Sequence, residues 1–310
     1  MLEFIETIEK HKLKKRIAII DIGSNAVRLH WADTSSSGHY EIIEKIRIPL
    51  CLGKSVFKTG EINSKCEKEL ITALTEFKKA LQQVSVSKFL CVATSAMRDA
   101  KNSADILKKV KAKTDINIKI ITGTEEAQLI QDSVRQVLPN LSAPCIFLDI
   151  GGGSTEICFQ SKSDPIDLNS FQLGTVRMLE KMPDDLDKLK NYLKLLAEKE
   201  TTKMTIVGTG GNLRRLGKLK KKILNNSNVS YLKGSEFNKI FKEISDVDPL
   251  KLMKKYDLKH DRAEVIGPAL KILKTILEII PNEGIHLPQV GLAHALLYEL
   301  TITEQLELLH

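Results

Sequence analysis

The sequence predicts an α/β fold that is built from two related domains. Two near-copies of one short signature favour this fold: residues 19–25 read IIDIGSN, and residues 147–155 read FLDIGGGST. Each copy has an apolar run, an aspartate, a loop of small residues and an alternating segment, which is typical of a strand, a tight turn and a second strand. Because one copy lies in each half, we expect an N-terminal domain at residues 1–127 and a C-terminal domain at residues 128–310. The final helix is the one element that could pack back on the first domain.

The first half alternates between strand and helix patterns. Apolar runs and alternation predict strands at residues 17–21, 26–32, 40–48, 88–93 and 116–121. Helical spacing predicts helices at residues 2–12, 64–84, 103–113 and 124–138. Glu125 and Glu126 fall in the first turn of the last helix, where acidic residues are favoured, and Pro139 ends it.

The second half repeats the plan. The predicted strands lie at residues 145–150, 154–160, 166–173, 204–208 and 284–288. The predicted helices lie at residues 175–181 and 185–199, from residue 212, over most of the chain after residue 235, and from residue 290.

Composition indicates a globular protein. Of 310 residues, 42% are hydrophobic and 28% are charged, which is typical of folded domains. No apolar run approaches the roughly 20 residues that a membrane-spanning helix needs, so we expect no membrane partner and a cytoplasmic location. The five cysteines are odd in number and form no C-x-x-C pair, so we expect free, mostly buried thiols in a reducing compartment.

The glycine loop of the second signature is a candidate phosphate site. Gly151, Gly152 and Gly153 follow an apolar strand, and each glycine costs about 0.5–1 kcal/mol of ordering that a plain hairpin turn does not require. Converging backbone N–H groups in such a loop bind anions. Asp149 and Glu156 flank the loop, and an aspartate beside such a nest suits a hard cation that binds phosphate oxygens.

Both signatures and four further segments resemble the exopolyphosphatase/guanosine pentaphosphate phosphatase family. The further segments, in family order, are ATSAMRDA at residues 93–100, ITGTEEA at 121–127, VGTGGN at 207–212 and RAEVI at 262–266. Together the matches extend from about residue 17 to about residue 298. The resemblance implies the actin/sugar-kinase/heat-shock ATPase (ribonuclease H-like) fold, with two domains and the active site in an interdomain cleft.

The resemblance also implies site residues. It places the catalytic glutamate in the pair Glu125 and Glu126, and the alignment favours Glu126. It assigns Asp149 and Glu156 to a metal ion, with Asp21 a further candidate by symmetry and Mg²⁺ or another divalent cation as cofactor. The implied phosphate-binding residues are Gly23, Ser24, Asn25, Arg98, Gly151, Gly152, Gly153, Ser154, Thr155, Gly208, Gly210 and Gly211.

The sequence departs from the family pattern in two places. Ala26 stands where the family usually has serine or threonine, which removes one hydroxyl from the first loop. Asn212 stands where threonine is common, which leaves open whether the late glycine loop holds further phosphates or a guanosine. Arg28 is open to two interpretations, a phosphate contact or a surface position on a strand.

Charge narrows the class of partner. The formal net charge is +8, which attracts polyanions. The densest basic run, at residues 214–222, is either a solvated helix face or a track for a polyanion. Nine Phe, five Tyr and one Trp do not interleave with this run, so base stacking has little support and no nucleic-acid partner is expected.

The expected reaction is hydrolysis of the terminal phosphoanhydride of inorganic polyphosphate by an in-line water that Glu126 orients. Guanosine pentaphosphate is the alternative substrate, with the same chemistry. An ATP-dependent kinase of the same superfamily is less favoured, because a kinase needs no water-activating glutamate. The intact carboxylates disfavour a non-catalytic phosphate sensor. A homodimer is compatible with the sequence, which leaves the oligomeric state, the substrate ranking and the metal open.

Chain length gives one further expectation. The sequence stops at His310, soon after the final predicted helix, whereas longer family members carry an extra C-terminal helical region that the resemblance links to gripping long polymers. We therefore expect frequent release of the polymer and a preference for short or intermediate chains.

Overall fold

The computed structural model describes residues 15–35, 39–182, 184–200 and 202–307, with only the backbone described for 303–307. The helix expected at residues 2–12 lies outside this part of the chain. The chain forms two compact units, one from Met1–Ile121 with Leu292–His310 and one from Thr122–Gly291. The domain boundary expected between residues 127 and 128 stays a prediction.

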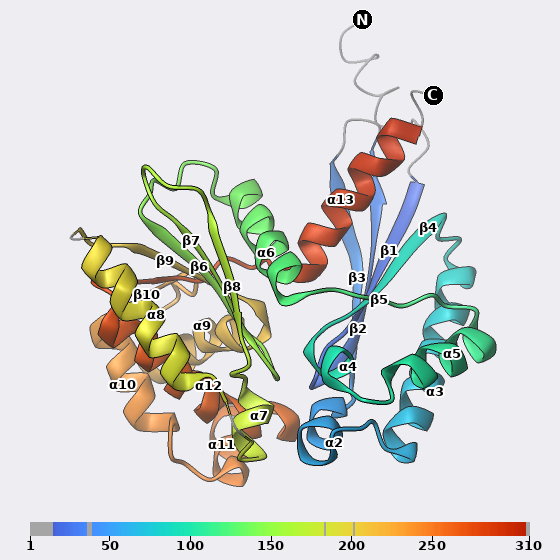
Figure 1. Ribbon diagram of the computed structural model, residues 1–310, viewed down its shortest axis with the longest axis horizontal. Helices are drawn as coiled ribbons and strands as arrows, with labels where there is room; N and C mark the ends of the chain where they lie inside the picture. The colour runs from blue at the N-terminus through green and yellow to red at the C-terminus, as the bar shows by residue number, and fades with distance from the viewer. Residues whose placement is uncertain (1–14, 36–38, 183, 201, 308–310) are drawn as a thin grey trace, which may run out of the picture. The chain divides into compact units, whose positions relative to one another are not determined.

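The first unit contains a mixed sheet in the order β3-β2-β1-β4-β5 within the described residues (Figure 1). Its strands are β1 (Lys15–Ile22), β2 (Ala26–Thr34), β3 (Tyr40–Pro49), β4 (Lys88–Ala93) and β5 (Lys119–Ile120). Its helices are α2 (Leu52–Thr59), α3 (Ser64–Gln83), α4 (Ser95–Asp99), α5 (Ser103–Thr114) and α13 (Leu292–Glu307). The final helix α13 packs across β1, β2, β3 and β4, while α3 packs on β2 and α5 on α3.

The second unit contains a mixed sheet in the order β10-β11-β9-β6-β7-β8 within the described residues (Figure 1). Its strands are β6 (Cys145–Ile150), β7 (Thr155–Gln160), β8 (Asp167–Phe171), β9 (Thr205–Thr209), β10 (Tyr231–Lys233) and β11 (Gly284–His286). Its helices are α6 (Gly123–Val137), α7 (Thr175–Leu179), α8 (Leu186–Lys199), α9 (Gly210–Leu224), α10 (Gly234–Ile244), α11 (Pro249–Tyr256) and α12 (His260–Ile279).

The two units share one plan, as the repeated signature predicts. In the first, the antiparallel meander β1-β2-β3 continues through parallel β4 and β5. In the second, the antiparallel meander β6-β7-β8 continues through parallel β9 and β11. Equivalent hydrogen bonds close both signature turns: Gly23 N donates to Ala26 O at 3.0 Å, and Gly151 N donates to Ser154 O at 2.9 Å.

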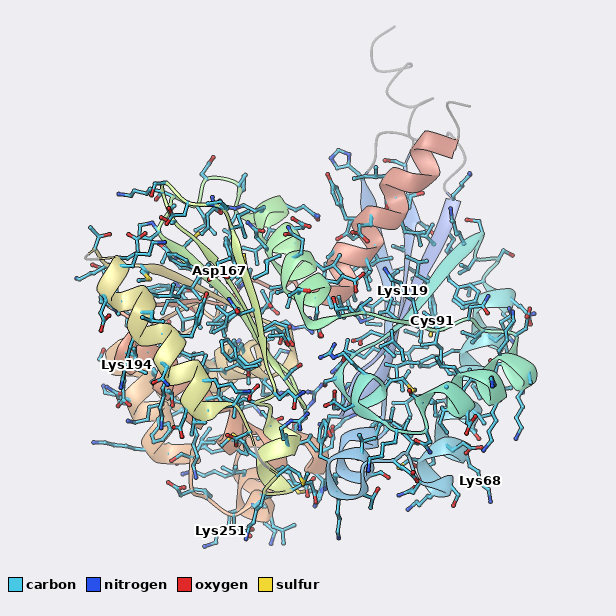
Figure 2. The ribbon with its side chains drawn as sticks, viewed as in Figure 1. Lys68, Cys91, Lys119, Asp167, Lys194 and Lys251 are labelled. Atoms are coloured by element: carbon cyan, nitrogen blue, oxygen red, sulfur yellow. The ribbon has the colours of Figure 1, made fainter. Side chains whose placement is uncertain are left out.

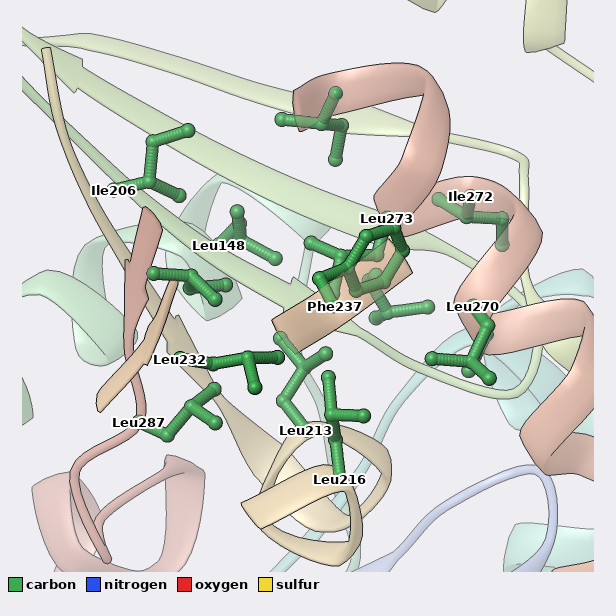
Figure 3. Packing of buried hydrophobic residues seen from close by; sticks show 14 of the residues in the cluster. Leu148, Ile206, Leu213, Leu216, Leu232, Phe237, Leu270, Ile272, Leu273 and Leu287 are labelled. Atoms are coloured by element: carbon green, nitrogen blue, oxygen red, sulfur yellow. The ribbon is translucent and has the colours of Figure 1, made fainter. Parts of the chain in front are cut away.

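Alternation along β6 separates the two faces of the second sheet. Ile146, Leu148 and Ile150 enter a large apolar core with residues of α8, α9, α10, α11 and α12. Figure 3 shows part of this core, where Leu148 and Ile206 lie near side chains from α9, α10 and α12. Cys145 and Phe147 point to the other face, where they pack against Ile130 and Val134 of α6. Because side chains alternate along a strand, Asp149 lies on the same face of the sheet as Cys145 and Phe147, the face that α6 covers.

Short elements were the hardest to predict. The sequence pattern did not predict α2, α4 or β10, and it predicted a six-residue strand where β5 has two residues, Lys119–Ile120. Tertiary contacts stabilise these elements more than their local sequence does. For example, β10 is three residues long and forms by antiparallel pairing with β11.

The positive charge is spread over separate elements. Lys68 of α3, Lys194 of α8 and Lys251 of α11 are exposed (Figure 2). All five cysteines have free thiols, as expected, and Cys91, Cys145 and Cys158 are buried. Burial raises the pKa of the Cys158 thiol to about 12, so it stays protonated at neutral pH. Among the described residues, none of the helices has both the length and the apolar character that crossing a membrane requires.

Candidate active site

Four polar residues form a row across the second sheet, on the face that α6 covers. In register, Thr209 of β9 lies beside Asp149 of β6, Asp149 opposite Glu156 of β7, and Glu156 opposite Ser170 of β8. We call these four residues the polar row. The neighbouring row on this face is apolar and packs under α6, with Val207, Phe147, Cys158 and Leu168. The α6-covered face of the sheet therefore changes from apolar to polar between two neighbouring rows of side chains.

Each carboxylate of the polar row has a hydroxyl next to it. The Ser170 hydroxyl donates to Glu156 Oε1 at 3.0 Å, and Thr209 Oγ1 lies 3.4 Å from Asp149 Oδ2. Glu156 is 1% exposed. Gly210 makes room for the other carboxylate, because a Cβ there would lie 2.1 Å from Asp149 Oδ1. Glu156 and Asp149 are therefore held at adjacent positions by polar contacts and close packing.

Helix α6 begins directly above the polar row. Its first residue, Gly123, abuts Ser170: a Cβ at position 123 would lie 2.2 Å from both Cβ and Oγ of Ser170. Glu126 is three residues after Gly123 and four before Ile130, which faces the sheet. Residues at these spacings share one side of a helix, so Glu126 lies on the sheet-facing side of α6, in the turn nearest the polar row.

Glu125 has a structural role at the start of α6, whereas the sequence analysis treated it as one of two candidates for the catalytic glutamate. Its carboxylate accepts a hydrogen bond from Thr122 N at 2.7 Å, while Glu125 N donates to the Thr122 hydroxyl at 3.1 Å. This reciprocal pair is a capping box, which satisfies backbone N–H groups at the start of a helix. Glu125 is exposed and Glu126 is half-buried. The geometry therefore favours Glu126 over Glu125 as the residue that faces the polar row.

The carbonyl groups of the glycine loop at residues 151–154 accept hydrogen bonds from α7, which hold the loop in place. Gly151 O accepts from Thr175 N at 3.0 Å, Gly152 O from Val176 N at 2.7 Å, and Gly153 O from Arg177 Nε at 2.9 Å. In a trans peptide the N–H points opposite to the C=O. The N–H groups of Gly152, Gly153 and Ser154 therefore point away from α7, as an anion nest requires.

The structure gives two residues near this loop roles that the sequence did not predict. Thr155, grouped there with the phosphate-binding residues, is fully buried, and its hydroxyl donates to Leu173 O at 2.6 Å. It points to the face opposite Glu156. Arg177 was not singled out, yet it is 6% exposed and holds the Gly153 carbonyl. An arginine in so apolar a segment is the signal that could have identified it.

The first signature forms a second loop with its own support. The hydroxyls of Ser24 and Ser95 lie 2.8 Å apart, and Gly53 N donates to Ser24 O at 2.8 Å. Asn25 receives a weak hydrogen bond from the Cys51 thiol at its Oδ1, at 3.6 Å. Ser95, the first residue of α4, is a neighbour of this loop that the sequence analysis did not name.

The equivalent of the polar row in the first unit has the opposite charge. Asp21 lies opposite Arg28, and Arg28 lies opposite Arg47. Arg28 Nη1 donates to Asp21 Oδ2 at 2.7 Å. The ion pair occupies the carboxylate that symmetry with Asp149 had suggested for a metal ion. The local surface of the first unit therefore suits an anion better than a cation.

The remaining predicted arginine, Arg98, lies in the last turn of α4. Its Nη1 donates to Ile121 O at 2.9 Å and the residue is half-buried. This bond fixes the guanidinium to the end of the first unit, and a planar guanidinium is the group that binds a phosphate through two hydrogen bonds.

The late glycine loop serves several purposes. Gly208 lies on the apolar face, where a Cβ would lie 2.5 Å from Leu213 Cδ1, so its role is packing. Gly210 has φ +79° and abuts Asp149. A Cβ at Gly211 would lie 3.2 Å from Arg262 Nη1. Asn212, where the sequence departs from the family pattern, donates from Nδ2 to Ile150 O at 2.8 Å and ties α9 to the end of β6.

The polar row fits a divalent cation that is shared with a substrate. Like charges opposite each other destabilise a sheet, and a buried carboxylate needs compensation, so a cation at Asp149 and Glu156 would relieve both costs. No group of three or more metal-binding side chains occurs among the described residues. Mg²⁺ commonly takes only one or two carboxylates and completes its shell with water and phosphate oxygens, which matches this pair.

The basic run at residues 214–222 is not one continuous track. Lys220 is 2% exposed, donates to Tyr231 O at 2.7 Å and lies 3.0 Å from Glu236 Oε2. Lys222 donates to Tyr256 O at 2.6 Å. The structure therefore corrects the interpretation of the whole run as a polyanion track, because Lys220 faces the core of the unit.

Known proteins are similar to this chain in sequence and in fold. The chain is 32% identical to exopolyphosphatase 1 of Mycobacterium tuberculosis over 171 residues, covering 55% of this chain and 50% of that protein. It is 24% identical to the guanosine-5'-triphosphate,3'-diphosphate pyrophosphatase of Photobacterium profundum over 306 residues, covering 94% of this chain and 61% of that protein. The chain thus spans about half to three fifths of the length of these relatives.

A solved exopolyphosphatase from Cytophaga hutchinsonii has the same fold, with a TM-score of 0.82 at 21% identity over 93% of this chain and 98% of that one. The solved Ppx/GppA family member of Aquifex aeolicus, at 26% identity and a TM-score of 0.73, has this fold as well. The fold is the actin/sugar-kinase/heat-shock ATPase fold, as the resemblance implied. The sequence profile of the Ppx/GppA phosphatase family matches residues 32–304. The chain belongs to the Ppx/GppA phosphatase family.

Proposed function

We propose that this protein hydrolyses the terminal phosphoanhydride bond of inorganic polyphosphate. The observation that carries the proposal is the polar row, with its two adjacent carboxylates, beside a glycine loop and under a helix that begins with Gly123 and presents Glu126. A phosphoryl-transfer site needs anion donors, compensation of phosphate charge and a group that orients the nucleophile. In the second unit, the glycine loop, the carboxylate pair and Glu126 support these three roles in turn. The names of the relatives support this reaction class.

Each group has a proposed role. The N–H groups of Gly152, Gly153 and Ser154 bind oxygens of the terminal phosphate, and the loop at residues 23–25 with Arg98 binds further phosphates of the substrate. Asp149 and Glu156 hold a divalent ion, proposed to be Mg²⁺, which offsets phosphate charge when bound. Glu126 accepts a hydrogen bond from the attacking water and orients it in line with the bond that breaks.

Guanosine pentaphosphate is the second candidate substrate. Its terminal phosphoanhydride is cleaved by the same chemistry, and the Photobacterium profundum relative is named for a guanosine polyphosphate. Arg262 against Gly211 would offer one further cation to such a ligand. The cytoplasmic location and a homodimer are also proposals, and size-exclusion chromatography with light scattering tests the dimer.

Phosphate release from polyphosphate, guanosine pentaphosphate and ATP, measured side by side, tests the proposed function. We expect release from polyphosphate or guanosine pentaphosphate at a higher kcat/KM than from ATP. No release from either of the first two substrates, with Mg²⁺ present, would contradict the proposal.

Two adjacent isosteric substitutions test the role of Glu126. Glu126→Gln should lower kcat about a hundredfold or more, because a neutral amide cannot accept the proton of the water. Glu125→Gln is the matched control, since glutamine preserves a capping box and kcat should stay near wild type. The reverse pattern would transfer the catalytic role to Glu125.

A further inference from the structure

We propose that Ser170 is a positioning residue that couples the Glu156 carboxylate to the start of helix α6. The proposal rests on the proposed function, because it assigns a use to the polar row. Ser170 makes two contacts with different partners. Its hydroxyl donates to Glu156 Oε1 at 3.0 Å, and its Cβ packs against Gly123, the first residue of α6.

The first contact orients the carboxylate. Glu156 is 1% exposed, and its side chain has three rotatable bonds. A hydroxyl donor at fixed position on the neighbouring strand favours the rotamer in which Oε1 receives that hydrogen bond. Groups of this kind, one step behind a metal ligand, set the orientation and basicity of the ligand. Ser170 is therefore suited to keep Glu156 in the orientation that a cation needs.

The second contact fixes the distance between α6 and the sheet. Any side chain at position 123 would bring a Cβ to 2.2 Å from the Ser170 Cβ, which is held by the backbone and cannot rotate away. The absence of a Cβ at Gly123 lets the first turn of α6 lie directly on β8. That turn carries Glu126 on its sheet-facing side, so the position of Glu126 depends on the same serine.

Glu156 and Glu126 are proposed to act on one substrate phosphate, the first through a cation and the second through water. The position of Glu156 relative to Glu126 depends on a single side chain. Ser170 donates a hydrogen bond to Glu156, and it packs under α6, the helix that carries Glu126. A change at either contact should therefore disturb both ion binding and turnover. The polar row supplies the chemistry, and Ser170 supplies its alignment.

Ser170→Ala removes the hydrogen bond and leaves the packing. Binding of Mn²⁺ in the presence of inorganic phosphate, followed by electron paramagnetic resonance, gives a readout that does not depend on activity. We expect the Kd for Mn²⁺ to rise about tenfold to a hundredfold, as for other residues that support metal ligands. The matched control is Ser161→Ala, because the Ser161 hydroxyl also donates to a glutamate, Glu200 Oε1, at 2.9 Å. Its Kd should equal that of the wild type.

Gly123→Ala changes the second contact of Ser170, the one with the first residue of α6. The new methyl should displace Ser170 or α6, raise the Kd for Mn²⁺ and lower kcat. Gly234→Ala is the control, because Gly234 also begins a helix and a Cβ there meets nothing within 4 Å. The effects of Gly123→Ala and Ser170→Ala on Mn²⁺ affinity should be non-additive in the double variant, since both act through one hydrogen bond.

The outcomes separate this inference from the proposed function. An unchanged Mn²⁺ Kd in folded Ser170→Ala, or additive effects in the double variant, would overturn the positioning role. If the wild type released no phosphate from any phosphoanhydride, the proposed function would fail. A raised Kd for Mn²⁺ in Ser170→Ala would still support the link between Ser170 and Glu156. Thermal unfolding of each variant identifies those that lose the fold.

Discussion

At the residue scale, one position distinguishes the two signatures. Asp21 and Asp149 end equivalent strands, yet Asp21 lies opposite Arg28 and Asp149 lies opposite Glu156. An arginine neutralises the first aspartate through an ion pair at 2.7 Å. A glutamate adds a second negative charge to the other, and this is the pair at which we propose a cation. A repeated backbone therefore carries two different binding surfaces.

Gly210→Ala tests the packing around Asp149. A methyl group there would meet Asp149 Oδ1 at 2.1 Å, and φ is +79°, so we expect a loss of about 1 kcal/mol or more in the free energy of unfolding and a higher metal requirement. Gly60→Ala is the control, with φ +81°, because the three heavy atoms nearest to a Cβ there all belong to the flexible Lys101 side chain. It should lose stability and keep its metal requirement. Equal metal requirements in both variants, measured by activity against Mg²⁺ concentration, would contradict this account of Gly210.

At the element scale, α6 and α9 show how one helix places residues of the same type in different surroundings. In α6, Glu125 completes the capping box and Glu126 faces the sheet. In α9, Lys218 is exposed, while Lys220 turns inward to Glu236. The basic pattern in the sequence is the same for both lysines, so charge alone does not reveal which of them is available to a polyanion.

Lys220→Met should destabilise the protein by about 1–3 kcal/mol, because it removes a buried donor from Tyr231 O and from Glu236. Burial raises the pKa of Glu236, but hydrogen bonds from Lys233 N and the Lys220 ammonium lower it below its ordinary value of 4.5. A lowered folded-state pKa stabilises above the unfolded value and is lost as the pH falls through the folded value. The stability difference from wild type should therefore shrink below about pH 4.5.

Urea unfolding at several pH values measures this difference. Lys218→Met is the control and should leave stability near wild type. If Lys220→Met instead raised KM for polyphosphate with unchanged stability, Lys220 would belong to a polyanion track after all.

At the scale of the whole molecule, the duplicated plan was predictable and several of its details were not. The signatures at residues 19–25 and 147–155 predicted both hairpins, because an apolar run, a loop of small residues and an alternating segment are typical of two strands joined by a tight turn. The opposition of Asp149 and Glu156 follows from the same turn. Ser170 was not predictable, since its partner is 14 residues away and only the register of β7 with β8 brings them together. The roles of Gly123 and Arg177 likewise depend on packing between elements.

Removal of metal tests the cation site. EDTA should abolish phosphate release, and Mg²⁺ should restore it. Asp149→Asn and Glu156→Gln should each raise the Mg²⁺ concentration for half-maximal activity, because a hard cation prefers ionised oxygen ligands. Asp132→Asn is the control, since Asp132 lies on α6 and accepts a hydrogen bond from Gln128. Full activity of the wild type in EDTA would show that the polar row acts without a metal.

The most direct measurement of the central claim is hydrolysis of polyphosphate in oxygen-18-labelled water. The account holds that water, oriented by Glu126, attacks the terminal phosphorus. Mass spectrometry should then find one labelled oxygen in each released phosphate and none in the shortened polymer. Unlabelled phosphate with label in the polymer, or transfer of the phosphoryl group to another acceptor without label, would contradict it.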